Sequence, residues 1–266
     1  MPPVLADRTY NPETSPDGFE RSKAALIAAF ASVELPAHPA YCAHCVTRED
    51  LLAFSGPPNL IAPDVASKFI RKVGTTWGGI TELQRITPRL LCLAADNQLE
   101  VHPNMMWEKL NAAQWRQWPS EQVKTIDNFL VGEFVRLLHT SPRPAHSAHR
   151  WLGAVSTGLE DLSPLLTAWH DSIGALPDPK MSETAVYHLV ELLTDSLLRP
   201  DLPATIGDLF PNNDSAGAQL SNFLRNPAVD VDLKRAAKNL SDSRYSRRIN
   251  IAIERLGRFK AASQRL

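Results

Sequence analysis

The sequence predicts an all-α protein, arranged as an irregular bundle or as stacked helix pairs. Apolar side chains recur every three or four residues along most of the chain, the pattern of helices that bury one face. No Asn-Gly or Asp-Gly turn lies between two stretches of alternating apolar residues, as a β-hairpin would require. Helix pairs of about 40 residues would also suit a solenoid of the HEAT kind, although no fixed sequence repeat accompanies them.

The first helix is expected to follow an extended arm. Residues 1–17 hold four prolines and few large apolar groups, and Asp17 is suited to cap a helix that runs towards residue 33. Thr47 and Asp50 have the spacing of a capping box and open a short helix. Pro88 falls inside the helix expected over residues 80–94, where it should cause a kink or a break.

The clearest helix begins at Ser120, which is a good capping residue. Its apolar stripe extends over more than four turns and consists of Val123, Ile126, Leu130, Phe134, Leu137 and Leu138. The remaining helices are expected near residues 63–73, 105–113, 144–157, 161–173, 182–198, 215–226, 229–241 and 243–262. A loop rich in proline and asparagine at 200–214 offers a place to subdivide the single domain expected over residues 18–266.

The net charge of the 266-residue chain is -1, but the charge is unevenly distributed. Residues 231–266 contain ten basic and three acidic side chains, a local net charge of +7. We expect the arginines of the last helix to lie mainly opposite its apolar side and to contact a partner. These are Arg244, Arg247, Arg248, Arg255 and Arg258. A protein partner is favoured over nucleic acid, because no helix-turn-helix or zinc-finger pattern accompanies the arginines.

Three observations favour the cytoplasm. The N-terminus lacks the basic and apolar regions of a secretory signal, and no stretch approaches the roughly 20 apolar residues that span a bilayer. The three cysteines form an odd set, which suits a reducing compartment better than a disulfide framework. We therefore expect no membrane association.

Cys42 and Cys45 are the best candidates for chemistry. A Cys-x-x-Cys turn can place two thiolates at the corner of a tetrahedral zinc site, and His38 and Cys92 are candidates for the remaining ligands. A second ligand pair at a recognisable distance is missing from the sequence, which weakens the zinc interpretation. A thioredoxin-like redox role would require the motif to lie in a βαβ unit, and none is predicted. We favour ordinary small, buried residues and keep zinc binding as the alternative.

Packing or solvent exposure explains the histidines and tryptophans more simply than metal or ligand binding does. His146 and His149 lie near an expected helix start without an acidic companion, so we expect them to be exposed and not to bind a metal. His139, His170 and His188 are expected to be packed and hydrogen-bonded. The six tryptophans lie beside apolar helical positions and are expected to pack between helices.

The middle of the chain contains five features in this order: Tyr41–Val46, Thr76–Gly78, Pro88–Leu91, Trp115 and the Trp118-Pro119 turn. In the order of these features the chain resembles a group of uncharacterised bacterial helical proteins. That group combines a Cys-x-x-Cys-Val segment with a Thr-Trp-Gly turn and a Pro-Arg-hydrophobic helix. The resemblance covers residues 41–135. It implies a bacterial origin and a helical fold, and it assigns no activity.

No phosphate-binding glycine loop, nucleophile elbow or kinase signature occurs in the sequence, which favours a protein without catalysis. We expect a helical protein-interaction module. Zinc binding through Cys42 and Cys45, and nucleic-acid binding through the basic C-terminal helix, stay open as alternatives.

Overall fold

The computed structural model describes residues 16–143, 147–174, 179–194, 206, 208–210, 213–240 and 245–263. Within these ranges the fold is all-α, as predicted, and Tyr41 and Trp77 form an isolated antiparallel bridge. A regular solenoid stays a prediction. The α-helices are α1 (Pro16–Ala29), α2 (Arg48–Ser55), α3 (Pro63–Lys72), α4 (Ile80–Ala95), α5 (Pro103–Ala112), α6 (Ser120–Leu138), α7 (Ala148–Val155), α8 (Ser163–Ile173), α9 (Pro179–Thr194), α11 (Asp214–Arg225), α12 (Pro227–Asn239) and α13 (Ser246–Ser263), with short 3-10 helices η2 (Pro58–Leu60) and η3 (Trp115–Gln117).

Local capping explains where α2 begins, whereas the cap expected for α1 is wrong. The capping box at α2 is confirmed, because the Asp50 N–H donates to Thr47 Oγ1 at 3.2 Å and the Thr47 N–H donates to Asp50 Oδ2 at 2.9 Å. Helix α1 begins at Pro16, so Asp17 lies inside its first turn and is not the N-cap that we expected. Residues 1–15 of the expected arm lie outside the described residues.

Pro88 does not break helix α4, which runs from Ile80 to Ala95. Proline in a helix removes one backbone hydrogen bond and crowds the preceding turn. Here α4 is buried on most sides, with Leu83, Ile86, Leu90 and Leu91 all at most 2% exposed. The packing of neighbouring helices around α4 outweighs the lost hydrogen bond.

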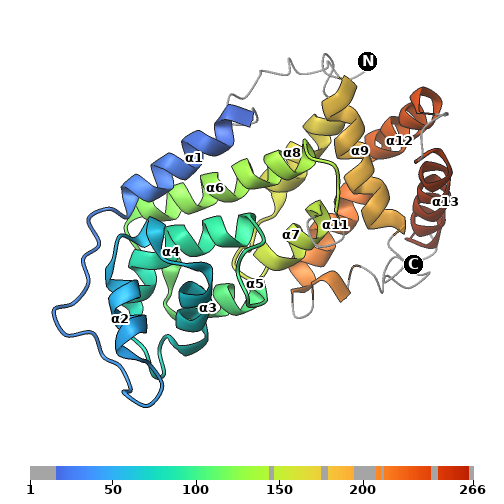
Figure 1. Ribbon diagram of the computed structural model, residues 1–266. Helices are drawn as coiled ribbons and strands as arrows, with labels where there is room; N and C mark the ends of the chain where they lie inside the picture. The colour runs from blue at the N-terminus through green and yellow to red at the C-terminus, as the bar shows by residue number, and fades with distance from the viewer. Residues whose placement is uncertain are drawn as a thin grey trace.

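Helix α6 is the central element, and α1 lies along it (Figure 1). The two helices approach closely at Gly132, where an added Cβ atom would stand 2.8 Å from Ser22 Oγ and 3.4 Å from Phe19 Cα. The predicted stripe of α6 is buried: Ile126, Leu130 and Phe134 are all 0% exposed. Helices α7, α8 and α9 also contact α6, so α6 packs against helices from both the N-terminal and the C-terminal halves of the chain.

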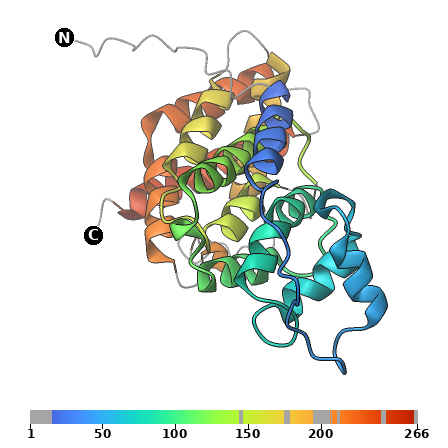
Figure 2. The ribbon, with the colours of Figure 1, turned by 90° about the vertical axis from the view of Figure 1, so that its left-hand side faces the viewer.

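Helices α2 and α3 lie at one end of the molecule, and α12 and α13 lie at the other (Figures 1 and 2). A continuous set of buried apolar side chains nevertheless extends from Phe19 to Phe259. Five of the six tryptophans are at most 7% exposed, and Trp118 packs against this core. Most of the loop proposed for a subdivision, at 200–214, lies outside the described residues.

In the part of the chain that the structure describes, no helix combines the length and the apolar character needed to cross a membrane.

Candidate functional site

A pocket of about 760 Å³ opens between α1 and α4, with the end of α2 and η2 at its edge. Pockets of about 300–1,000 Å³ are typical of ligand sites. Helix α4 contributes one face at helical spacing, consisting of Arg85, Pro88, Arg89, Cys92 and, at its C-cap, Asp96. The apolar periodicity of the sequence does not reveal this face as a site, because polar residues on a helix usually face solvent.

Two arginines in the pocket wall have neutral partners. Arg85, which is 9% exposed, donates from Nη1 to the Phe54 carbonyl at 3.1 Å and from Nη2 to the Gly56 carbonyl at 2.6 Å. Arg89 donates from Nε to the Ile61 carbonyl at 2.9 Å. Burial lowers the pKa of Arg85. Within the described ranges no carboxylate forms an ion pair with either guanidinium.

The rest of the pocket combines apolar and charged groups. Three basic and two acidic side chains line it, Lys23 and Glu34 being those from outside α4. Apolar residues on and after α1 form the opposite wall, where Ile27 is 41% exposed. The pocket therefore suits a ligand with an apolar body and a negative charge.

Cys92 lines this pocket at 7% exposure. Its pKa is raised to about 11, because burial disfavours the thiolate. Among the described residues, which include His38, Cys42, Cys45 and Cys92, no three or more His, Cys, Asp or Glu side chains are grouped so that they could hold a metal ion. The predicted four ligands are thus not assembled within this chain, and zinc binding stays a prediction.

Cys42 and Cys45 do lie together, in the turn that leads into α2. The pKa of Cys42 is lowered, chiefly by a hydrogen bond from the His44 N–H and then by one with the Cys45 side chain; the Cys45 N–H and the charge of Lys72 act in the same direction, and burial opposes them. Both cysteines are partly exposed rather than buried. The hydrogen bonds of the turn therefore favour the thiolate form of Cys42.

The basic residues of α13 divide into two sets. Arg248 donates from Nη1 to Glu191 Oε1 at 2.5 Å and from Nη2 to Thr194 Oγ1 at 2.7 Å, and Arg255 donates to the Leu193 carbonyl at 3.0 Å. Our expectation that the arginines point mainly away from the apolar side is wrong for these two. Carbonyl groups near a helix C-terminus carry partial negative charge, which attracts guanidinium groups to this part of α9.

The other arginines of α13 are more accessible. Arg247 and Arg258 are exposed, and Arg258 forms an exposed ion pair with Glu254 at 2.8 Å. Arg244 lies outside the described residues. The basic surface available to a partner is therefore smaller than the sequence indicated.

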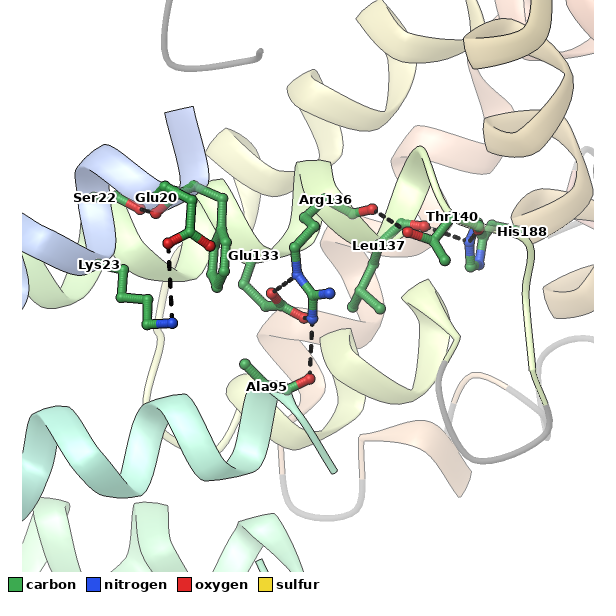
Figure 3. A network of polar contacts seen from close by, with 10 residues as sticks. Glu20, Ser22, Lys23, Ala95, Glu133, Arg136, Leu137, Thr140 and His188 are labelled. Atoms are coloured by element: carbon green, nitrogen blue, oxygen red, sulfur yellow. Dashed lines mark hydrogen bonds and ion pairs between the residues drawn. The ribbon is translucent and has the colours of Figure 1, made fainter. Parts of the chain in front are cut away.

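An ion pair between buried Glu133 and partly exposed Arg136 lies between α1, α4 and α6 (Figure 3). Arg136 donates from Nε and Nη2 to the two carboxylate oxygens of Glu133, at 2.6 and 2.8 Å, and also from Nη2 to the Ala95 carbonyl at 3.1 Å. Its guanidinium lies 4.9 Å from the ring centroid of Phe19. Through these contacts Arg136 of α6 connects α1 and α4 to α6, which indicates that Arg136 has a structural role.

Histidines at the centre of the molecule are also structural. His188 is fully buried and hydrogen-bonded, as predicted: Nδ1 accepts the Ala148 N–H at 3.1 Å, and Nε2 donates to the Leu137 carbonyl at 2.7 Å. His149 was expected to be exposed, but it is 3% exposed and lies 3.2 Å from Ser147 Oγ. The start of α7 is covered by α9 and other neighbours, a tertiary contact that the local sequence does not encode. His146 lies outside the described residues.

Comparison of the chain with models of known protein families, with curated proteins and with solved structures finds no match. The resemblance over residues 41–135, and the bacterial origin that it implies, stay predictions.

Proposed function

We propose that this chain is a non-catalytic protein-interaction module that binds an acidic segment of a partner protein in the pocket between α1 and α4. The supporting observation is the environment of Arg85 and Arg89, whose guanidinium groups contact neutral carbonyls in the pocket wall. A partly buried positive charge without an anion is costly. A carboxylate from the partner would offset that cost and form charge-assisted hydrogen bonds.

The apolar part of the pocket defines the rest of the partner segment. Ile27 is 41% exposed on α1 and lies in the same pocket as the two arginines. An aliphatic side chain next to the carboxylate would cover Ile27 and gain the free energy of apolar burial. The segment that we propose therefore carries Asp or Glu beside Leu, Ile or Val.

Exposed apolar side chains near the pocket favour a protein over a small metabolite. Helix α2 and η2 contribute Ser55 and Pro58 to the pocket edge, and the same two elements expose Leu52 at 66% and Leu60 at 72%. A partner protein that fills the pocket can extend over this surface, whereas a small molecule leaves it uncovered. We place this function in the bacterial cytoplasm, as the free cysteines and the sequence resemblance predict.

Selection of a random peptide library on the immobilised full-length chain tests this proposal. Enriched peptides should contain a carboxylate beside an aliphatic residue. A synthetic copy of an enriched peptide should bind Arg89→Gln and Ile27→Asp at least about tenfold more weakly than the unsubstituted chain, since a lost charge-assisted bond or an added like charge is worth ~1.4 kcal/mol or more.

Matched control variants lie at the other end of the molecule. Arg247→Gln removes an exposed arginine from α13, and Val231→Asp places a charge at a residue that is 60% exposed on α12. Both should bind the peptide normally, and thermal melting should show that all four variants are folded. Peptides without acidic residues, or equal binding to all variants, would overturn the proposal. Binding of a medium-chain fatty acid in the pocket, with no peptide enriched, would also overturn it.

A further inference from the structure

Cys42 and Cys45 occupy the two ends of one hydrogen-bonded turn. The Cys45 N–H donates to the Cys42 carbonyl at 2.9 Å, and the Val46 N–H donates to the same carbonyl at 3.0 Å. A turn closed in this way brings its first and fourth Cα atoms within about 7 Å of each other. Disulfides need Cα separations of about 4.4–6.8 Å, so the backbone already has nearly the geometry of a disulfide.

Contacts that do not involve the thiols hold this turn in place. The Cys42 N–H donates to the Thr76 carbonyl at 2.8 Å, and the Lys72 ammonium donates to the Cys45 carbonyl. Val46, which follows the turn, is 2% exposed and belongs to the core. The two cysteines can therefore change oxidation state while the surrounding backbone stays fixed.

The two cysteines are also accessible. Each is partly exposed, and the hydrogen-bonded turn holds their backbones close together. Cys92 differs, because it is 7% exposed and lies on α4. Reactivity towards external disulfides follows thiolate character and access, so the structure separates a reactive pair from an inert third thiol.

We propose that Cys42 and Cys45 form a reversible redox dithiol that exchanges with low-molecular-weight disulfides of the glutathione type. In the first step the Cys42 thiolate attacks one sulfur of the external disulfide, and one glutathione leaves as a thiolate that takes up a proton. In the second step Cys45 loses its proton and attacks the Cys42 sulfur, which releases the second glutathione. Two protein thiols are thereby oxidised, and one external disulfide is reduced to two thiols.

Intact-protein mass spectrometry of the full-length chain tests this inference. The metal-depleted, reduced Cys92→Ala variant is incubated with glutathione disulfide, and it should lose two hydrogen atoms and retain no glutathione. Dithiothreitol should restore the original mass. In the same background Cys45→Ser should accumulate one bound glutathione, because the second step then lacks its thiol.

The inference would be overturned if the variant with both Cys42 and Cys45 retained glutathione or did not react. It would also be overturned if the Cys92→Ala variant and the Cys92→Ala/Cys45→Ser variant gave the same glutathione adduct. Peptide binding is measured separately, so failure here leaves the proposed interaction site untouched.

Discussion

Gly158 lies directly against the indole ring of Trp107. A Cβ atom added to Gly158 would stand 2.2 Å from Trp107 Cε3, far inside contact distance, and Trp107 is only 1% exposed. The neighbouring Thr157 carbonyl accepts a hydrogen bond from Asn111 Nδ2 at 2.6 Å. The turn after α7 is therefore fixed against α5, and a side chain at residue 158 has no room.

Gly158→Ala should lower the free energy of unfolding by about 1–3 kcal/mol, since a methyl group forced into a packed core displaces its neighbours. Urea unfolding measures the change. Gly257→Ala is the matched control, because an added Cβ atom meets nothing within 4 Å in helix α13, and there alanine should stabilise by up to ~1 kcal/mol. An equal effect of the two substitutions would contradict the contact.

Glu133 should make the stability depend on pH. Burial raises its pKa from 4.5 to about 7, and Arg136 acts against this rise. Between these two values the folded protein keeps a proton that the unfolded chain has released, so stability falls as the pH rises. Glu133→Gln cannot titrate and should lack this dependence.

Urea unfolding from about pH 4 to about pH 8 tests that expectation. The stability of the unsubstituted chain relative to Glu133→Gln should decline between about pH 4.5 and about 7 and level off above. Glu254→Gln, at an exposed residue of α13, should follow the unsubstituted chain. Parallel profiles for the unsubstituted chain and Glu133→Gln would show that Glu133 does not titrate in this range.

His188→Ala should destabilise the fold by about 1–3 kcal/mol, because a buried donor loses its acceptor. The substitution leaves the Ala148 N–H without the imidazole, inside the contact of α6, α7 and α9, while the Leu137 carbonyl keeps its hydrogen bond from the Thr140 N–H. Chemical denaturation measures the loss. His38→Ala, at an exposed residue, should change stability by no more than about 0.5 kcal/mol, and a loss as large as that of His188→Ala would argue against a specific role for the buried imidazole.

Arg248 and Arg247 should behave differently, although they are adjacent in the sequence. Arg248→Met removes the contacts with Glu191 and Thr194 and should cost about 1–2 kcal/mol, since Glu191 is partly buried and loses its ion pair. Arg247→Met, at an exposed residue, should change stability by less than about 0.5 kcal/mol. Thermal melting of both variants measures the difference, and equal melting temperatures would refute the docking of α13 on α9 through Arg248.

Much of the local structure could be predicted from the sequence. The stripe from Ile126 to Leu138 determines the buried side of α6, because helical periodicity fixes which residues share a face. The spacing of Thr47 and Asp50 likewise determines the start of α2, since both hydrogen bonds of a capping box are made within four residues. These features depend on short-range geometry.

The candidate sites could be predicted only in part. The Cys42–Cys45 turn is visible in the sequence because its two thiols are three residues apart. The pocket is not visible in the sequence, since it forms only when Ile27 of α1 lies opposite Arg85 and Arg89 of α4. From the sequence alone, an arginine on a helix is predicted to face solvent.

Local patterns in the sequence are sufficient to predict an all-α chain, most of its helix positions and the Cys42–Cys45 turn. The burial of Glu133 beside Arg136, the contact of Arg248 with α9 and the pocket between α1 and α4 appear only in the folded chain. Periodicity and capping act over a few residues, whereas burial and ion pairing depend on which distant helices meet.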